Sequence, residues 1–132
     1  MVTGYLGIRG GSGLPRYFMY EEWQSRMGKS LWEAKDKYLA SSAIVEADKI
    51  HTPLLIWHND RDEAVAYEQG RALYLAMRRL QRPAWHLNYK SEGHFLGNQA
   101  AQKDWTIRMK QFFDYYLKGT KEPRWMKEGI HL

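Results

Sequence analysis

The sequence predicts an α/β fold in which parallel strands alternate with helices. Two short apolar runs, at about 53–58 and 83–89, have the composition of strands, and the segments at about 67–80 and 102–117 each carry an apolar face at helical spacing. The order strand, helix, strand, helix is that of an α/β fold with right-handed crossovers. Because sheets hold about 5–6 strands on average, we expect the C-terminal portion of a larger sheet.

The first part of the chain is predicted with less regular structure. Residues 3–16 are rich in glycine and indicate a short strand at 5–8 that runs into a loop. A helix is expected over Tyr20–Met27. A second helix is expected to open at a capping box, in which Ser30 and Glu33 stand three residues apart.

The strand at 53–58 is apolar at nearly every position, which is typical of a strand covered on both faces. The helix at 67–80 then leads to the second strand at 83–89. The last long helix, at 102–117, is expected to end at Gly119 because glycine favours the left-handed conformation found at helix ends.

The composition excludes several classes of protein. Hydrophobic residues make up 44% of the 132 residues and charged residues 27%, which argues against a disordered chain. No apolar run approaches the ~20 residues of a membrane span, so we expect no membrane insertion. The net charge of +5 comes from scattered basic residues, so we expect no nucleic-acid partner. The absence of cysteine excludes a disulfide scaffold and a cysteine nucleophile, and leaves the cellular compartment open.

Charged and ionisable side chains follow both predicted strands. Asp60, Asp62 and Glu63 follow the first strand, and His94 follows the second. Functional residues of open parallel sheets lie in such loops at the carboxyl ends of strands. An acid followed by a histidine is the order of the last two members of the Ser–Asp–His triad of α/β-hydrolases. A loop carboxylate and a loop histidine are also common as plain surface residues, and on position alone either Asp60 or Asp62 fits the acid role.

Two stretches make the interpretation more specific. Residues 49–65 (KIHTPLLIWHNDRDEAV) and residues 88–94 (NYKSEGH) resemble the prolyl oligopeptidase family of serine peptidases. In that family an apolar strand leads into a His-Gly/Asn-x-x-Asp-x-x-Val loop, whose aspartate belongs to the triad. The resemblance assigns this role to Asp62, with Val65 as the marker, and makes His94 the triad base.

The resemblance implies a partial α/β-hydrolase fold and serine-type hydrolysis of a peptide substrate, with no cofactor and no metal. It covers residues 1–126, the C-terminal part of the catalytic domain, and leaves 127–132 as a tail. The family's nucleophile stands in a Gly-x-Ser-x-Gly elbow. The nearest match, residues 10–14 (GGSGL), places Leu14 where the last glycine belongs, so Ser12 is not expected to be the nucleophile and the chain alone is expected to be inactive.

Two other functions stay open at this point. The chain could be a non-enzymatic, truncated or assembly module, or a portion of an esterase-like hydrolase of the same fold. The few strands leave an open sheet edge, so we expect self-association or pairing with the missing N-terminal part.

The other histidines are expected to have structural roles. His58 ends the first strand and is expected to be hydrogen-bonded, and His51, His86 and His131 do not have the spacing of a metal site.

Overall fold

The computed structural model describes residues 10–129. In chain order, the elements are α1 (Tyr17–Glu21), α2 (Lys35–Ala40), the 3₁₀ helix η2 (Ala43–Lys49), β1 (Leu54–Trp57), α3 (Glu68–Arg79), β2 (Ala84–Leu87), α4 (Gln99–Lys118) and α5 (Arg124–Glu128). The strand predicted at 5–8 lies outside the described residues. None of the helices within the described part of the chain is both long and apolar enough to cross a membrane.

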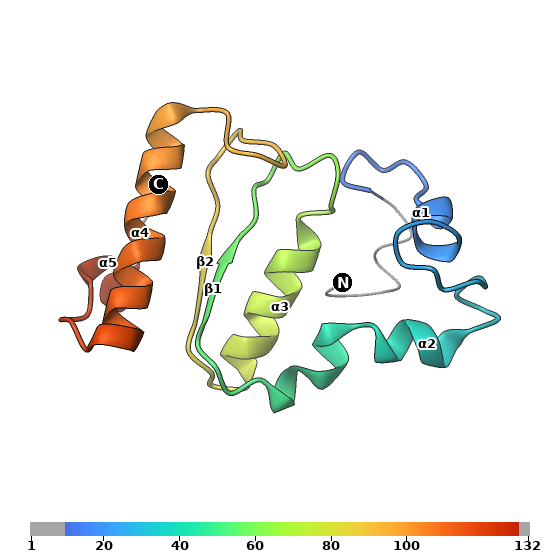
Figure 1. Ribbon diagram of the computed structural model, residues 1–132, viewed down its shortest axis with the longest axis horizontal. Coiled ribbons are helices and arrows are strands. Elements are labelled where there is room, and N and C mark those ends of the chain that lie inside the picture. The colour runs from blue at the N-terminus through green and yellow to red at the C-terminus, as the bar shows by residue number, and fades with distance from the viewer. Residues whose placement is uncertain (1–9, 130–132) are drawn as a thin grey trace.

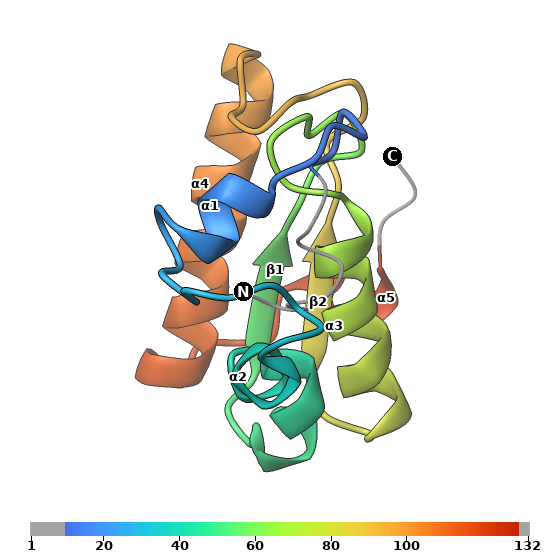
Figure 2. The same cartoon turned by 90° about the vertical axis from the view of Figure 1, so that its right-hand side faces the viewer.

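Strands β1 and β2 lie side by side and run in parallel, with Leu54 opposite Ala84 and Trp57 opposite Leu87. Helix α3 connects them and covers one face of this small sheet, while α4 covers the other (Figures 1 and 2). The prediction of parallel strands with flanking helices is therefore confirmed. Because both strands run in the same direction, their carboxyl ends meet at one end of the sheet, and the loops that follow them lie together there (Figure 1).

Side chains alternate between the two faces of the sheet, as the pleat requires. On the α4 side, the ring of Trp57 packs against Trp105 of α4, with ring centroids 5.3 Å apart. On the α3 side, the His86 ring lies 5.5 Å from the ring of Tyr67 and 5.7 Å from that of Tyr74. Aromatic rings thus pack on both faces of the sheet and hold it between α3 and α4.

The first helix differs from its prediction. Helix α1 spans Tyr17–Glu21 instead of Tyr20–Met27. The chain leaves helical geometry after Glu22, and Arg26 and Gly28 both have positive φ (49° and 73°). An L-residue resists positive φ, so surrounding contacts must hold Arg26 there. Pattern alone does not reveal such a turn.

Only half of the predicted capping box forms, because the Glu33 N–H donates to the Ser30 carbonyl instead of the Ser30 hydroxyl, and the motif does not open a helix. The Glu33 carboxylate accepts hydrogen bonds from the Ser30 backbone N–H (3.1 Å) and from the Ser30 hydroxyl. Ala34 then has φ −137° and ψ 44°, outside the helical region, and α2 begins only at Lys35. The local hydrogen bonds therefore close a single turn.

The last long helix begins three residues earlier than predicted. The Asn98 side chain caps α4 by accepting from the backbone N–H groups of Ala100 (2.8 Å) and Ala101 (3.3 Å). The helix ends at Gly119 as predicted, with that residue at φ 65°. Beyond it the chain forms α5, a short helix that the sequence did not indicate. Met126 of this helix is buried.

Candidate active site

The loop after β1 (residues 59–66, the acid loop) presents Asp62 to the interior. One carboxylate oxygen of Asp62, Oδ1, accepts from the backbone N–H groups of Ala64 (2.9 Å) and Val65 (2.8 Å). Aspartate readily binds the backbone two and three residues ahead of it in this way. The turn orients the carboxylate and leaves its second oxygen, Oδ2, available to another partner.

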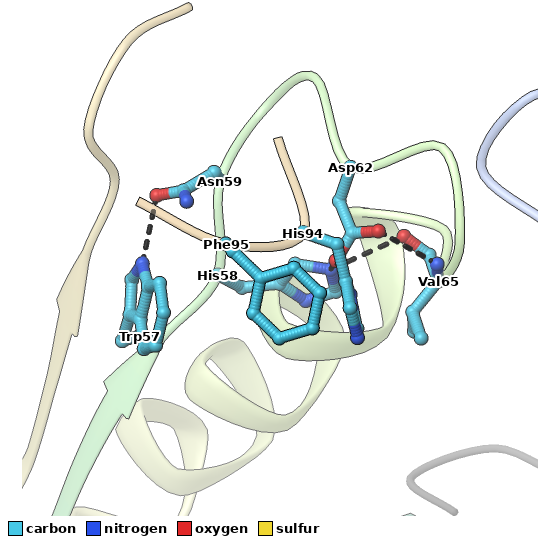
Figure 3. A pocket seen from close by; sticks show the side chains of 7 residues that line it. All are labelled: Trp57, His58, Asn59, Asp62, Val65, His94 and Phe95. Carbon is cyan, nitrogen blue, oxygen red and sulfur yellow. Dashed lines mark hydrogen bonds and ion pairs between the residues drawn. The ribbon is translucent and has the colours of Figure 1, made fainter. Parts of the chain in front are cut away.

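That partner comes from the loop after β2 (residues 88–98, the base loop). Nδ1 of His94 lies 2.8 Å from Oδ2 of Asp62, across 32 residues of sequence. The structure therefore brings together the two side chains that the sequence singled out, each on a loop at the carboxyl end of its strand (Figure 3). A contact of this length between an imidazole and a carboxylate is a charge-assisted hydrogen bond.

The surroundings of Asp62 favour its charged form. The side chain is only 5% exposed, and burial by itself disfavours the carboxylate. The N–H of Val65, the His94 side chain and the N–H of Ala64 outweigh burial, so the pKa of Asp62 lies below its ordinary value. Asp62 therefore remains an anion at neutral pH and stabilises positive charge on the adjacent imidazole.

His94 lies at the border between this buried carboxylate and an open pocket. Its side chain is 44% exposed, and its ring packs edge-on against Phe95 with centroids 4.9 Å apart. The pocket has a volume of about 350 Å³ and is lined by the residues drawn in Figure 3: Trp57, His58, Asn59, Asp62, Val65, His94 and Phe95. Because Nδ1 faces Asp62, Nε2 is the ring nitrogen left for a reacting group.

Asp60 occupies a different place in the acid loop. It is exposed, and its Oδ1 accepts from the backbone N–H of Ser91 at 3.0 Å. Its own backbone N–H donates to the side chain of Asn88 at 3.1 Å. Asp60 thus links the backbones of the two loops, whereas Asp62 contacts His94.

The glycine-rich segment lies against the acid loop. The backbone N–H of Ser12 donates to the carbonyl of Glu63 at 3.1 Å, and Ser12 is exposed and does not line the pocket. A Cβ atom on Gly11 would stand 1.6 Å from the carbonyl oxygen of Asp62. A glycine is therefore required at residue 11 for the two backbones to approach, which gives this segment a packing role next to the site.

A second histidine reaches Asp62. Nε2 of His58 lies 3.2 Å from Oδ2 of Asp62 and 3.2 Å from the carbonyl oxygen of Val65. Nδ1 of His58 accepts from the backbone N–H of Gly70 at 3.2 Å, which places the ring proton of neutral His58 on Nε2, facing the acid loop. Sequence reasoning expected a hydrogen-bonded His58 but did not connect it with Asp62.

The other histidines of the described residues, His51 and His86, make no contact with Asp62. His51 is exposed, His86 packs on the α3 face of the sheet, and His131 lies outside the described residues. Within residues 10–129, no group of three or more His, Cys, Asp or Glu side chains is placed to hold a metal ion.

Comparison with known proteins identifies the family. The model of the prolyl oligopeptidase family matches residues 11–120, which include both strands and both loops. The chain belongs to this family. Membership in the prolyl oligopeptidase family confirms the resemblance seen in residues 49–65 and 88–94.

Several curated relatives are peptidases by name. The chain is 29% identical over 91 residues to a probable dipeptidyl-peptidase 5 of Aspergillus clavatus, covering 67% of this chain and 12% of that protein. It is 28% identical over 115 residues to dipeptidyl aminopeptidase BIII of Pseudoxanthomonas mexicana, covering 85% and 17%. It is 23% identical over 119 residues to the uncharacterized peptidase YuxL of Bacillus subtilis, covering 88% and 18%. The chain thus spans less than a fifth of the length of these prolyl oligopeptidase relatives.

The fold is similar to that of a solved hydrolase. Esterase 2 of Thermogutta terrifontis, in a form phosphonylated by sarin, superposes with a TM-score of 0.55 at 20% sequence identity. The match covers 79% of this chain and 37% of the esterase. This likeness shows that the two strands and their helices form part of an α/β-hydrolase fold.

Proposed function

We propose that this chain supplies the acid and the base of a Ser–Asp–His triad to a serine-type peptidase of the prolyl oligopeptidase family. The 2.8 Å contact between Asp62 and His94 carries the proposal. The buried, ionised carboxylate supports it as well, because a triad needs an acid that stays charged beside its histidine.

In this function Nε2 of His94 takes the proton of a serine hydroxyl as the serine oxygen attacks the peptide carbonyl carbon. The resulting imidazolium is stabilised by Asp62 through Nδ1, and it then gives its proton to the leaving amine. Water releases the acyl group by the same steps with His94 again acting as base. Asp62 keeps its negative charge throughout and holds the imidazole in the tautomer with the proton on Nδ1.

The nucleophile is proposed to come from outside residues 10–129. Ser12 is exposed and donates its backbone N–H to the acid loop. Among the described residues no helix follows it directly, because α1 begins only at Tyr17, whereas an elbow that exposes a catalytic serine leads straight into a helix. The pocket beside His94 is the space in which such a serine hydroxyl would have to lie. We propose that the chain corresponds to the C-terminal part of the catalytic domain, which agrees with the small share of its relatives that it spans.

The test is steady-state hydrolysis of chromogenic peptide amides by the protein that carries this chain. We expect Asp62→Asn to lower kcat about 10⁴-fold, because an amide cannot hold the imidazole in its productive tautomer. Asp60→Asn is the matched control, since it keeps an acceptor oxygen for Ser91 and removes the same charge from the same loop. The kcat of this control variant is expected to stay within a few-fold of the kcat of the original protein.

Three results would contradict the proposal. The first is an equal loss of activity in Asp60→Asn and Asp62→Asn, which would show that the assignment of the triad acid to Asp62 is wrong. The second is activity on esters with none on peptide amides, which would favour an esterase. The third is hydrolysis by the isolated 132-residue chain that is lost on Ser12→Ala, which would make residue 12 the nucleophile.

A further inference from the structure

Asn59 places a buried amide between the acid loop and the base loop. It directly follows His58 and is only 2% exposed. A buried amide deprived of water must find its partners within the protein, since an unpaired polar group in the interior is costly. The hydrogen-bond partners of Asn59 therefore show which parts of the two loops it connects.

The Asn59 side chain makes three hydrogen bonds of 2.8–3.1 Å. Oδ1 accepts from the indole N–H of Trp57 (2.9 Å) and from the backbone N–H of Tyr89 (3.1 Å). Nδ2 donates to the carbonyl oxygen of Gly93 (2.8 Å). The first two partners can only donate and the third can only accept, so the orientation of the amide is fixed.

Two of these partners enclose the segment that leads to His94. Tyr89 stands at the start of the base loop, and Gly93 immediately precedes His94. Asn59 therefore binds this segment at both of its ends, although its own backbone belongs to the acid loop. In Figure 3, Asn59 lies beside the segment that carries His94 and Phe95 and is joined to Trp57.

Other hydrogen bonds also join the two loops, but they are more open to water. Ser91 donates its backbone N–H to exposed Asp60, and the N–H of exposed Arg61 donates to the carbonyl of Glu92 at 3.3 Å. Water can replace bonds of this kind at little free-energy difference. The Asn59 side of all three of its hydrogen bonds is buried, so breaking them leaves a buried amide unpaired.

We propose that Asn59 is a positioning residue that holds His94 against Asp62 by fixing the base loop onto the acid loop. The inference rests on the proposed function, in which the contact between Asp62 and His94 does the catalytic work. It adds a residue whose side chain has no hydrogen bond to the side chains of Asp62 or His94 and acts through the backbone of Gly93.

The test follows the imidazole Nδ1–H proton of His94 by NMR in the full 132-residue chain. A hydrogen bond to a carboxylate moves this proton resonance downfield and slows its exchange with solvent. Asp62→Asn removes the carboxylate and is expected to move the resonance upfield. This variant tests the pairing of Asp62 with His94 independently of Asn59.

Two variants test Asn59 itself. Asn59→Asp keeps the acceptor for Trp57 and Tyr89 and replaces the donor to Gly93 by a second carboxylate oxygen, which cannot donate. Asn59→Ala loses all three bonds. We expect both to move the His94 resonance upfield and to speed its exchange roughly tenfold, equivalent to about 1.4 kcal/mol. The control is Ser42→Ala, which removes another buried side-chain hydrogen bond, the 2.6 Å bond from Ser42 to the Tyr38 carbonyl, away from both loops. It is expected to leave the resonance unchanged.

The outcomes separate the two proposals. If Asp62→Asn leaves the resonance in place, the proposed acid–base pair is wrong. If Asp62→Asn moves it while both Asn59 variants leave it in place, the role of Asn59 is wrong and the proposed function stands. Should neither Asn59 variant fold, solvent exchange of the Asn59 side-chain amide in the original chain decides, because rapid exchange there would contradict a shielded bond to Gly93.

Discussion

At the scale of single residues, His86 shows how the packing of the sheet controls ionisation. It lies between Tyr67 and Tyr74, and its Nε2 is buried with no hydrogen-bond partner among residues 10–129. Burial, together with the nearby His58 and Arg71, lowers the pKa of His86 from 6.5 to about 4. The folded chain therefore keeps this imidazole neutral at a pH where the unfolded chain protonates it.

This difference predicts a loss of stability in weak acid. A group that binds its proton less readily when folded stabilises the fold above its unfolded pKa, and that contribution falls as the pH drops from 6.5 towards 4. We expect the free energy of unfolding to fall by roughly 2 kcal/mol between neutral pH and about pH 5 on account of His86. Urea titrations of the chain and of His86→Phe at both pH values measure this, and an equal decrease in the two proteins would contradict it.

A second prediction at this scale concerns Gly11. A methyl group there would collide with the carbonyl of Asp62, and the nearby backbone of Glu63 leaves it no space. We expect Gly11→Ala to lower the free energy of unfolding by about 1–3 kcal/mol, the usual effect of forcing extra volume into a packed site. Gly97→Ala is the control, because the nearest atom to a Cβ there is 3.7 Å away. Similar urea midpoints for the two variants would show that the segments do not pack as described.

At the scale of elements, the cap of α4 is a further test. The Asn98 side chain satisfies two backbone N–H groups at the start of this helix, which otherwise lack partners. We expect Asn98→Ala to lower the free energy of unfolding by about 1 kcal/mol. Gln99→Ala changes the next, exposed side chain and is expected to have little effect. A loss as large in Gln99→Ala would show that the cap is not the cause.

The elements that periodicity predicted are those held by long apolar faces. β1, β2, α3 and α4 combine such faces with packing on a neighbour, so pattern and tertiary structure agree on them. Helix α1 differs from its prediction because it ends at Glu21, and Arg26, inside the predicted helix, has a positive φ that no propensity favours. At the site, the pairing of Asp62 with His94 was predicted from strand order and from the family pattern. The bond from Asn59 to Gly93 was not, because a contact between two loops leaves no periodic trace in the sequence.

At the scale of the whole molecule, the sheet is incomplete within residues 10–129. In the part of the chain that the structure describes, the sheet holds two strands, and each of them pairs on one side only. Large apolar side chains are also exposed on the first part of the described chain, including Phe18 and Trp23 (61% each) and Trp32 (66%). An unpaired edge and an open apolar surface both favour association with another chain.

We therefore expect the isolated 132-residue chain to self-associate at micromolar concentration. Sedimentation velocity measures this directly, and a folded, strictly monomeric chain would contradict it. The double variant with Phe18→Ser and Trp23→Ser separates the two surfaces. If the chains associate through the edge of β1, this variant is expected to associate as well. If they associate through the exposed aromatic side chains, the variant is expected to be monomeric.

The short distance along the chain between Asp62 and His94 has a consequence for how the site is assembled. Only 32 residues separate them, and these residues complete a single crossover from one parallel strand to the next. The entropy lost in closing a loop grows only with the logarithm of its length, and here β1, α3 and β2 supply the contacts that offset it. The hydrogen bond between Asp62 and His94 can therefore form within one supersecondary unit, before long-range segments arrive. On the proposed function, the acid and the base then belong to one unit whose geometry does not depend on the segment that carries the nucleophile.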